Sequence, residues 1–205
     1  MPAVRSAVAT LLRDPGRALR LVVYLLTRNS VSGLGTRLRN AALPGLVADC
    51  GPGLSVGPGA VVWGFENIRL GRNVGFMADL RLYAMGESTV EIGDEASIND
   101  NVQINAGPRG RIQIGKAFLS GPNVVLRNCN HAWKDASRRI LDQGHECADI
   151  VIEDDVWIAA NAVVLGGAHI KSGCVVAAGS VVRPGVYEPG TVLAGNPAVE
   201  VSERV

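Results

Sequence analysis

Two of the three histidines of this 205-residue chain lie in one short stretch, which is therefore the first place to look for chemistry. The stretch runs Arg127-Asn128-Cys129-Asn130-His131-Ala132-Trp133 and continues to Gly144-His145-Glu146-Cys147. A histidine titrates near neutrality, so it can take a proton from a hydroxyl group at working pH. His131 is the candidate general base, and an ordinary loop histidine is the alternative that spacing alone leaves open. His145 is assigned no role.

The same stretch holds Cys129 and Cys147, each separated by one residue from a histidine. Two thiolates and two imidazoles could bind zinc, but chelating pairs are usually spaced by about two to four residues. The sequence therefore predicts no metal site and favours small, partly buried thiols. The four cysteines, which also include Cys50 and Cys174, follow no regular spacing in a chain too large to need disulfides, which favours a reducing cytoplasm.

A repeat of six residues organises most of the chain and must position this stretch. Residues that are apolar, except Ser120, recur at this period: Ile152, Ile158, Val164, Ile170, Val176 and Val182, with shorter sets at Ile92, Ile98 and Ile104, at Ile114, Ser120 and Leu126, and at Leu70, Phe76 and Leu82. A period of six fits neither a single strand nor a helix, but it fits a short strand and a turn per repeat. Three repeats close one coil, so the sequence predicts a parallel β-helix from about residue 50 to 198.

The spacing of the sets also predicts one long loop. Ile114 and Ile152 are 38 residues apart, which exceeds by 20 the 18 residues between Ile152 and Ile170. The excess places a loop at about 127–151, where a solenoid can carry functional residues without disturbing its coils. His131 follows the last coil residue, Leu126, so its backbone should be well placed. His169 precedes a coil residue and is expected on ordinary surface.

Composition agrees with a β structure. Valine occurs 27 times and isoleucine 11 times, against 3 each of Phe, Tyr and Trp. β-Branched residues suit half-buried strands. The net charge of +1 argues against nucleic acid as a partner, which would require a strong basic excess.

Residues 1–45 have a different pattern, with helical spacing of apolar residues on both sides of Asp14-Pro15-Gly16. We expect a helical or irregular cap there, followed by a β-helix domain over 46–205. Arginines interleave with the apolar residues, so peripheral contact with an acidic membrane surface is an alternative compatible with the cap. The longest apolar run, Leu21 to Leu26, is far shorter than the roughly 20 residues of a membrane span, and no signal-peptide pattern follows. The expected location is the cytoplasm, at the inner face of the membrane if the cap contacts it.

Four segments carry a resemblance to a known family: 114–126 followed by Asn130-His131, then 156–165, 177–182 and 194–198. They resemble the hexapeptide-repeat acyltransferases, above all the galactoside and maltose O-acetyltransferases and the bacterial polysaccharide O-acetyltransferases. The resemblance implies a left-handed parallel β-helix, a homotrimer and a coenzyme A thioester as acyl donor.

The resemblance also implies roles for individual residues. His131 matches the catalytic base, and Trp157 matches an active-site tryptophan on the substrate side. Asn99 matches an asparagine that contacts the sugar, although asparagine also recurs in solenoid turns for local reasons. The sugar-binding carboxylates of the galactoside enzymes have no clear counterpart here, which indicates a different acceptor.

Ala160, Ala178 and Arg183 match positions that hold coenzyme A, the alanines through their main chain and the arginine through its charge. Three departures affect this site. Ala159 stands where glycine usually follows the isoleucine, which is a mild change. Arg183-Pro184 stands where Thr-Lys is common, and Val199-Glu200-Val201 lacks the basic residue that usually follows the Asn-Pro-Ala turn. The contacts to the adenosine end are thus the least defined.

Together these features predict an O-acetyltransferase that moves an acetyl group from acetyl-CoA, its co-substrate, to a hydroxyl of a saccharide, in cell-surface polysaccharide biosynthesis and without a metal. A catalytically silent scaffold subunit and a serine-type or other small-molecule acetyltransferase are the alternatives. The large N-terminal helical domain of serine acetyltransferases has no counterpart here. A zinc carbonic anhydrase of this fold is disfavoured, because the three histidines do not fall at the coil spacings such a site requires.

Overall fold

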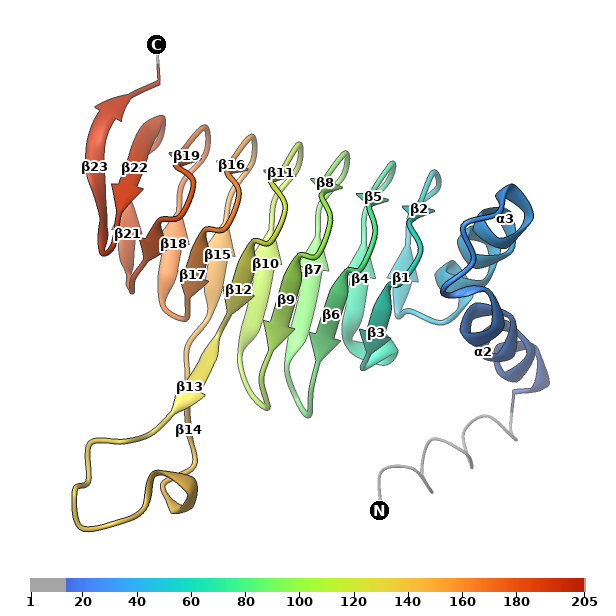
Figure 1. Ribbon diagram of the computed structural model, residues 1–205, viewed down its shortest axis with the longest axis horizontal. Helices are drawn as coiled ribbons and strands as arrows, with labels where there is room; N and C mark the ends of the chain where they lie inside the picture. Colours follow the sequence, from blue (N-terminus) through green and yellow to red (C-terminus); the bar gives the residue numbers. More distant parts are fainter. Residues whose placement is uncertain (1–13, 205) are drawn as a thin grey trace.

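The computed structural model describes residues 14–204, which form a column of stacked β coils with two helices at its N-terminal end (Figure 1). Three parallel sheets make the sides of the column. The first sheet contains β1 Asp49–Cys50, β4 Ile68–Leu70, β7 Thr89–Ile92, β10 Arg111–Ile114, β15 Ile150–Ile152, β18 Ala168–Ile170 and β21 Gly185–Tyr187. The expected parallel β-helix is confirmed.

The second sheet contains β2 Ser55–Val56, β5 Gly75–Phe76, β8 Ser97–Ile98, β11 Leu119–Ser120, β16 Trp157–Ile158, β19 Val175–Val176, β22 Thr191–Gly195 and β23 Ala198–Glu203. The third contains β3 Val61–Trp63, β6 Arg81–Ala84, β9 Gln103–Ala106, β12 Val125–Arg127, β17 Val163–Leu165 and β20 Val181–Val182. Only β23 breaks the parallel order of these sheets, because it folds back antiparallel to β22 at the C-terminal end.

The six-residue repeat fills the interior of the column. Ile114 pairs with Ile152, and Ile152 with Ile170, so residues separated by 38 and by 18 positions stand in one vertical row. Ile152, Ile158 and Val164 are each no more than 1% exposed. Burial of these aliphatic side chains supplies the main stabilisation of the coils.

Differences in coil length are concentrated at the corner between the third and the first sheet, here called the variable corner. Between β17 and β18 the chain crosses it with Gly166 and Gly167 alone, whereas four residues, 85–88 and 107–110, are needed after β6 and after β9. After β12 the chain leaves the column altogether and returns at β15. That excursion is more ordered than the expected loop at 127–151, because β13 Cys129–His131 and β14 His145–Cys147 pair as an antiparallel hairpin.

The corner between the second and third sheets is regular by contrast. It holds Asn101, Asn123 and Asn161 on successive coils, all in the left-handed backbone region with φ of 53°, 61° and 61°. Their side-chain amides bond to one another in a ladder, at 2.9 Å between Asn101 and Asn123 and at 3.0 Å between Asn123 and Asn161. Asparagine suits this position because its short polar side chain tolerates left-handed backbone.

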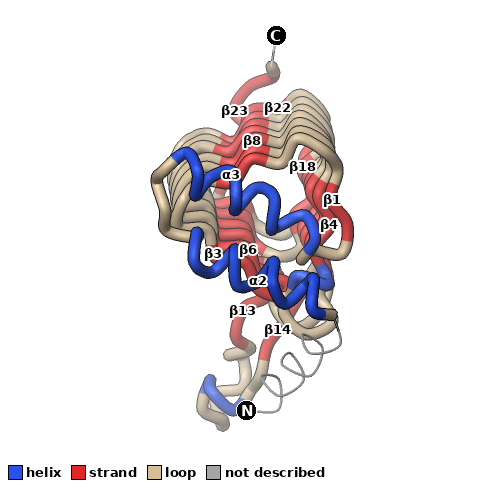
Figure 2. The backbone as a smooth tube through the Cα atoms, turned by 90° about the vertical axis from the view of Figure 1, so that its right-hand side faces the viewer, coloured by secondary structure: helices blue, strands red, loops and turns tan. Residues whose placement is uncertain are grey.

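Helices α2 Pro15–Thr27 and α3 Gly33–Ala42 lie across the open N-terminal end of the column (Figure 2). They are followed by a short 3₁₀ turn, η1 Leu43–Gly45; two more such turns, η2 Phe65–Asn67 and η3 Ile140–Asp142, occur later. Asp14 and Ser32 cap α2 and α3, each accepting a hydrogen bond from a backbone N–H of the first turn. The helical segment expected before residue 14 lies outside the described residues.

The helical cap replaces the coil that is missing below β2. The Asn40 side-chain oxygen accepts a hydrogen bond from the Val56 N–H at 2.9 Å, and the Arg39 guanidinium donates to the Val56 carbonyl at 2.9 Å. Arg39 is fully buried and donates also to the carbonyls of Thr27 and Ser30. The exposed edge of β2 is thus closed by side chains of α3.

Candidate functional site

The hairpin that carries His131 is fixed at its root by Asn128, which is 1% exposed. Its side-chain oxygen accepts a hydrogen bond from the Gly107 N–H at 2.6 Å, and its amide nitrogen donates to the Arg109 carbonyl at 2.9 Å. The Asn128 carbonyl accepts from the Ala148 N–H on the returning strand. One buried amide therefore joins the start of the hairpin, its end and the preceding coil.

Two glycines make room for this root. A Cβ on Gly107 would lie 2.4 Å from the Cys129 sulfur, and one on Gly166 would lie 2.3 Å from the Asn128 carbonyl oxygen. Neither position has space for a side chain, so close backbone approach fixes where β13 begins. The hairpin then projects sideways from the column, beyond every coil (Figure 1).

His131 is exposed on β13 and lies directly opposite His145 on β14. The two imidazole rings are 4.5 Å apart between centroids and tilted by 36°. The structure therefore places beside His131 a residue to which the sequence assigned no role. The symmetry of the two pairs about residue 138 was the signal that could have found this, because antiparallel strands pair residues in that way.

The expectation of free thiols at Cys129 and Cys147 is wrong. Cys129 lies opposite Cys147 in the hairpin, with Cα atoms 4.1 Å apart, and the two are joined by a disulfide. Such close cross-strand approach is what brings two cysteines into bonding reach. Cys50 and Cys174 are free, and Cys174 is buried. Cysteine usage consequently no longer argues for a reducing compartment.

Among residues 14–204, no three His, Cys, Asp or Glu side chains are grouped so that they could hold a metal ion. The sulfurs of the Cys-x-His and His-x-Cys pairs are bonded to each other in this structure.

A hollow of about 230 Å³ lies at the foot of the hairpin. It is bounded by Asn130 and Glu146 on the hairpin and by Gly166 and Pro184 on the next coils. Asn130 is adjacent to His131, and Pro184 is adjacent to Arg183. The variable corner thus brings the segments of the predicted base and of the predicted coenzyme A arginine to the two sides of one hollow.

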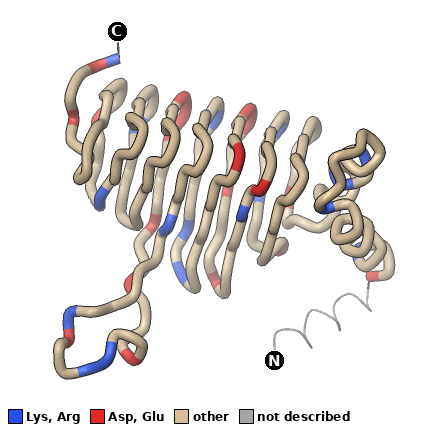
Figure 3. The backbone as a smooth tube through the Cα atoms, viewed as in Figure 1, with Lys and Arg blue, Asp and Glu red and all other residues tan. Residues whose placement is uncertain are grey.

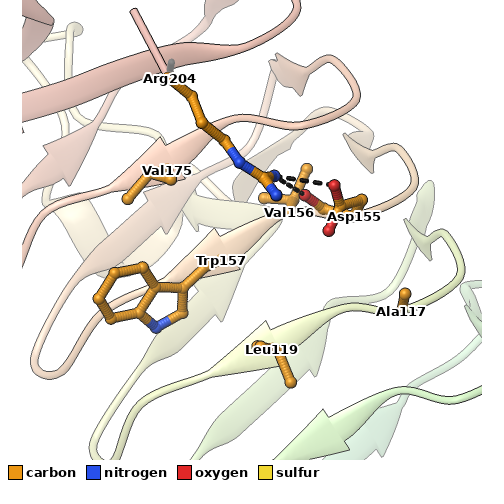
Figure 4. A pocket seen from close by; sticks show the side chains of 7 residues that line it. All are labelled: Ala117, Leu119, Asp155, Val156, Trp157, Val175 and Arg204. Atoms are coloured by element: carbon orange, nitrogen blue, oxygen red, sulfur yellow. Dashed lines mark hydrogen bonds and ion pairs between the residues drawn. The ribbon is translucent and has the colours of Figure 1, made fainter. Parts of the chain in front are cut away.

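Trp157 lies in a different place, on the outer face of the second sheet (Figure 4). Its indole, about half exposed, lines a second hollow of about 230 Å³ together with Leu119 and Val175. Arg204 reaches into this hollow from the end of the chain and donates to the Asp155 carboxylate at 2.8 Å. No sequence pattern marks Arg204 as a site residue, because it lies beyond the last repeat. His131 does not line this hollow.

The remaining predicted site residues lie on two corners of the coil. Ala160 and Ala178 follow β16 and β19 on successive coils, at the corner between the second and third sheets, and Asn99 follows β8 at the same corner. Arg183 follows β20 at the variable corner and is exposed. The Asn99 side-chain oxygen accepts from the Asp100 N–H at 2.7 Å, which is a local turn bond.

His169 is more engaged than expected of ordinary surface, because its Nε2 lies 2.8 Å from the Glu153 carboxylate. Ser172 donates to the same carboxylate from both its hydroxyl and its N–H. The hydrogen bond with His169, followed by that from the Ser172 hydroxyl, holds the pKa of Glu153 below its ordinary value. The group ties two neighbouring coils together on the first sheet, away from the hairpin.

Charge is spread over the described residues without a single-sign field (Figure 3). Arginine and lysine alternate with acidic residues along the coils, as in the pairs Arg72–Asp94 and Lys171–Glu188. At the hairpin tip, Arg139 pairs with Asp142 in the same way. Among the described helices, none has the length and apolarity that crossing a membrane requires.

The family described as bacterial transferase hexapeptide, six repeats, matches residues 149–184. Its structural relatives are acetyltransferases with hexapeptide repeats, so the resemblance seen in the sequence is confirmed.

Two curated relatives match part of the chain. An acetyltransferase-like protein of Saccharomyces cerevisiae is 35% identical over 123 residues, which is 60% of each chain. A 2,3,4,5-tetrahydropyridine-2,6-dicarboxylate N-acetyltransferase of Staphylococcus aureus is 48% identical over 54 residues, 26% of this chain and 22% of the relative. The match spans less than two thirds of the length of these relatives.

Three solved structures share the fold. A hexapeptide-repeat acetyltransferase of Vibrio cholerae is 27% identical, with a TM-score of 0.59, over 93% of this chain and 91% of that one. A galactoside acetyltransferase bound to coenzyme A has 24% identity and a TM-score of 0.61, over 92% and 80% of the two chains. An N-acyltransferase of Bacillus cereus, bound to coenzyme A and a dTDP-linked amino sugar, has 15% identity and a TM-score of 0.69, over 78% and 85%.

Proposed function

We propose that this protein is an O-acetyltransferase that transfers the acetyl group of acetyl-CoA to a hydroxyl of a saccharide. The observation that carries the proposal is the hollow at the variable corner, which has the strand of His131 on one side and the residue after Arg183 on the other. The hairpin that carries His131 and the coil that carries Arg183, a cation suited to a nucleotide phosphate, thus meet at this corner. The fold shared with enzymes bound to coenzyme A supports the same donor.

In the proposed reaction, His131 removes the proton from the acceptor hydroxyl as that oxygen attacks the thioester carbonyl. The resulting tetrahedral intermediate collapses, the carbon–sulfur bond breaks, and the coenzyme A thiolate takes up the proton from the imidazolium. The alkoxide is scarce at neutral pH, so a positioned base contributes roughly 10²- to 10⁴-fold. No metal is needed for these steps.

The donor fits the residues of the two corners. Ala160 and Ala178 offer main-chain groups on successive coils without bulky side chains, which leaves space for the pantetheine arm. Arg183 makes no ion pair with any residue in the range 14–204, so its charge is available for a phosphate. We place the acceptor beside Asn99 and Trp157.

A homotrimer would complete the site. His131 is on the hairpin that leaves the variable corner, whereas Trp157 lines the hollow on the second sheet, so in the proposal a neighbour's flank supplies the tryptophan side of the cleft. We therefore propose that the hairpin of one subunit reaches the Trp157 face of the next.

The remaining features of the proposal concern the cell. We assign residues 1–45 as a cap and 46–205 as the catalytic β-helix domain, acting on precursors of cell-surface polysaccharide. Leu19, Leu26 and Val31 are more than 60% exposed on the cap, and these apolar side chains support peripheral contact with a membrane surface. Binding of the cap to anionic vesicles tests this part.

An amine acceptor is the second candidate, favoured by the relatives named N-acetyltransferase and N-acyltransferase. A panel of saccharides, amino sugars, serine and other small acceptors, each supplied with acetyl-CoA and followed by release of free thiol, separates these readings. Turnover with a hydroxyl sugar supports the proposal, and turnover with amines alone replaces it. A chain that releases no thiol with any acceptor would be a scaffold subunit.

A further inference from the structure

Two cysteines and two histidines face each other in pairs along the hairpin β13–β14. Cys129 lies opposite Cys147 and His131 opposite His145, and alternate residues of a strand project from the same face. The disulfide is at the root of the hairpin, and the stacked imidazole pair is one step further out. Asn130 and Glu146 occupy the opposite face.

We propose that His145 is a positioning residue for the catalytic base His131, and that the Cys129–Cys147 disulfide holds the strand register on which their stacking depends. The inference rests on the proposed function, because it takes His131 as the base. It gives roles to His145 and to the disulfide, for which neither the repeat nor the resemblance provides one.

The hairpin needs such support because it pairs with no other strand within residues 14–204. β13 and β14 form a two-stranded sheet of their own, and an isolated hairpin is marginally stable in water. A slip of one residue would turn His131 to the opposite face of the ribbon. A covalent bond between Cys129 and Cys147 excludes that slip.

The root of the hairpin is tied to the column as well as to itself. The Cys129 sulfur lies 3.8 Å from the Arg109 carbonyl and packs against Gly107. The Asn128 side chain accepts a hydrogen bond from the Gly107 N–H and donates one to the Arg109 carbonyl. Contacts of Asn128 and Cys129 with the preceding coil therefore fix where β13 begins. What the root cannot fix is the rotation of the exposed His131 ring, and contact with His145 restricts that rotation.

The first arm of the test changes the ring of His145. His145→Ala removes the stacking partner and is expected to lower kcat by about 10- to 100-fold, the size of effect that misplacement of a catalytic group produces. The KM for acetyl-CoA should stay unchanged, because the donor is held by other coils. His145→Phe keeps a flat ring without nitrogen atoms and should recover most of kcat. Lys134→Ala, an exposed change in the same loop that lines neither hollow, is the control.

The second arm opens the disulfide. The double variant Cys129→Ser/Cys147→Ser should lower kcat by a similar factor with the KM for acetyl-CoA unchanged. Excess dithiothreitol should do the same to the unaltered protein: the reagent is oxidised to its cyclic disulfide and supplies the two electrons and two protons that convert the cystine into two thiols. EDTA is included so that no metal binds the freed thiols. Loss of thioester absorbance reports the rate, because added thiols would mask free coenzyme A.

Combining the changes tests whether both act on one ring. If they do, the fold-loss of kcat in the triple variant Cys129→Ser/Cys147→Ser/His145→Ala is smaller than the product of the separate fold-losses. Full activity of His145→Ala or of the cysteine variant overturns the inference. Equal losses for His145→Phe and His145→Ala also overturn it, because they would show that the imidazole nitrogens, not the ring contact, are required.

His131→Ala separates this inference from the proposed function. If His131→Ala is as active as the unaltered protein, the proposed base is wrong and the inference falls with it. If His131→Ala is inactive while the His145 and cysteine variants are fully active, the base stands and only the positioning role is refuted. Circular dichroism of each variant confirms that the coils are intact.

Discussion

His131 and Arg183 belong to one corner of the column but serve different parts of the proposed reaction. The imidazole acts on a proton that moves only in the transition state, whereas the guanidinium holds a donor that is bound throughout. Their substitution should therefore affect different kinetic constants.

Replacing His131 by alanine should lower kcat by roughly 10²- to 10⁴-fold, because the acceptor hydroxyl loses its base. The KM for acetyl-CoA should change little. Initial rates of coenzyme A release at varied acetyl-CoA give both constants. Lys134→Ala, an exposed change in the same loop, is the control, and a His131→Ala enzyme with normal turnover would exclude this residue as the base.

Replacing Arg183 by alanine should raise the KM for acetyl-CoA about tenfold, the equivalent of one lost charge-assisted hydrogen bond. Turnover at saturating donor should be nearly normal, because the reacting atoms are elsewhere. The same assay measures it, with Arg37→Ala on α3 as the control at the far end of the column. A reduced kcat with an unchanged KM would place Arg183 in the chemistry instead of the donor site.

Among the elements, the coils follow from the sequence and the hairpin does not. Every sixth position from Ile152 to Val182 is aliphatic, and a period of six has only one compact solution, so the column and the position of its insertion are predictable. The pairing within the insertion depends on how the chain turns between Ala132 and Gly144, and no periodicity constrains that turn. For this reason the disulfide and the His131–His145 contact were missed, although the residues of both pairs had been singled out.

The asparagine ladder offers a test of what the regular corner contributes. Asn123→Ala removes two amide hydrogen bonds and places alanine in left-handed backbone, so the free energy of unfolding should fall by about 1–2 kcal/mol. Asn123→Gly relieves the backbone but still loses the bonds, and it should be the milder change. Urea titration of each variant measures the difference.

At Ala117, which lies in an equivalent left-handed turn of another corner, a substitution is expected to raise the stability instead of lowering it. Its φ is 53° and it has no polar side chain to compensate. Ala117→Gly should therefore stabilise the protein, by about 0.5 kcal/mol after the entropy cost of glycine. A destabilised Ala117→Gly protein would show that left-handed backbone strain costs little at this turn, which lies between the first and second sheets.

At the scale of the whole molecule, Arg39 joins the cap to the column. Arg39→Leu would leave the carbonyls of Val56, Thr27 and Ser30 without their buried donor, and the free energy of unfolding should fall by about 3 kcal/mol. Thermal or urea unfolding measures the loss. Arg37→Ala, two residues away and exposed, should be near neutral, and a neutral Arg39→Leu would mean that α3 contributes little to the closure of the column.

The proposed trimer makes its own prediction about shared active sites. If each site combines the hairpin of one subunit with the Trp157 face of the next, the two single variants His131→Ala and Trp157→Ala should each be impaired. Subunits of both kinds, mixed by denaturation and refolding, should regain activity, because some interfaces then pair an intact hairpin with an intact face. Mixtures no more active than their parents, or a fully active monomer in sedimentation, would contradict the shared site.

The closed edge of β2 also bears on the protein's fate at high concentration. A stack of parallel strands can serve as a template for any chain that presents a matching edge, and filaments grow by such addition. Asn40 and Arg39 occupy both hydrogen-bonding groups of Val56, and β23 covers β22 at the other end by running in the opposite direction. Growth along the column axis is thereby blocked at both ends of the second sheet.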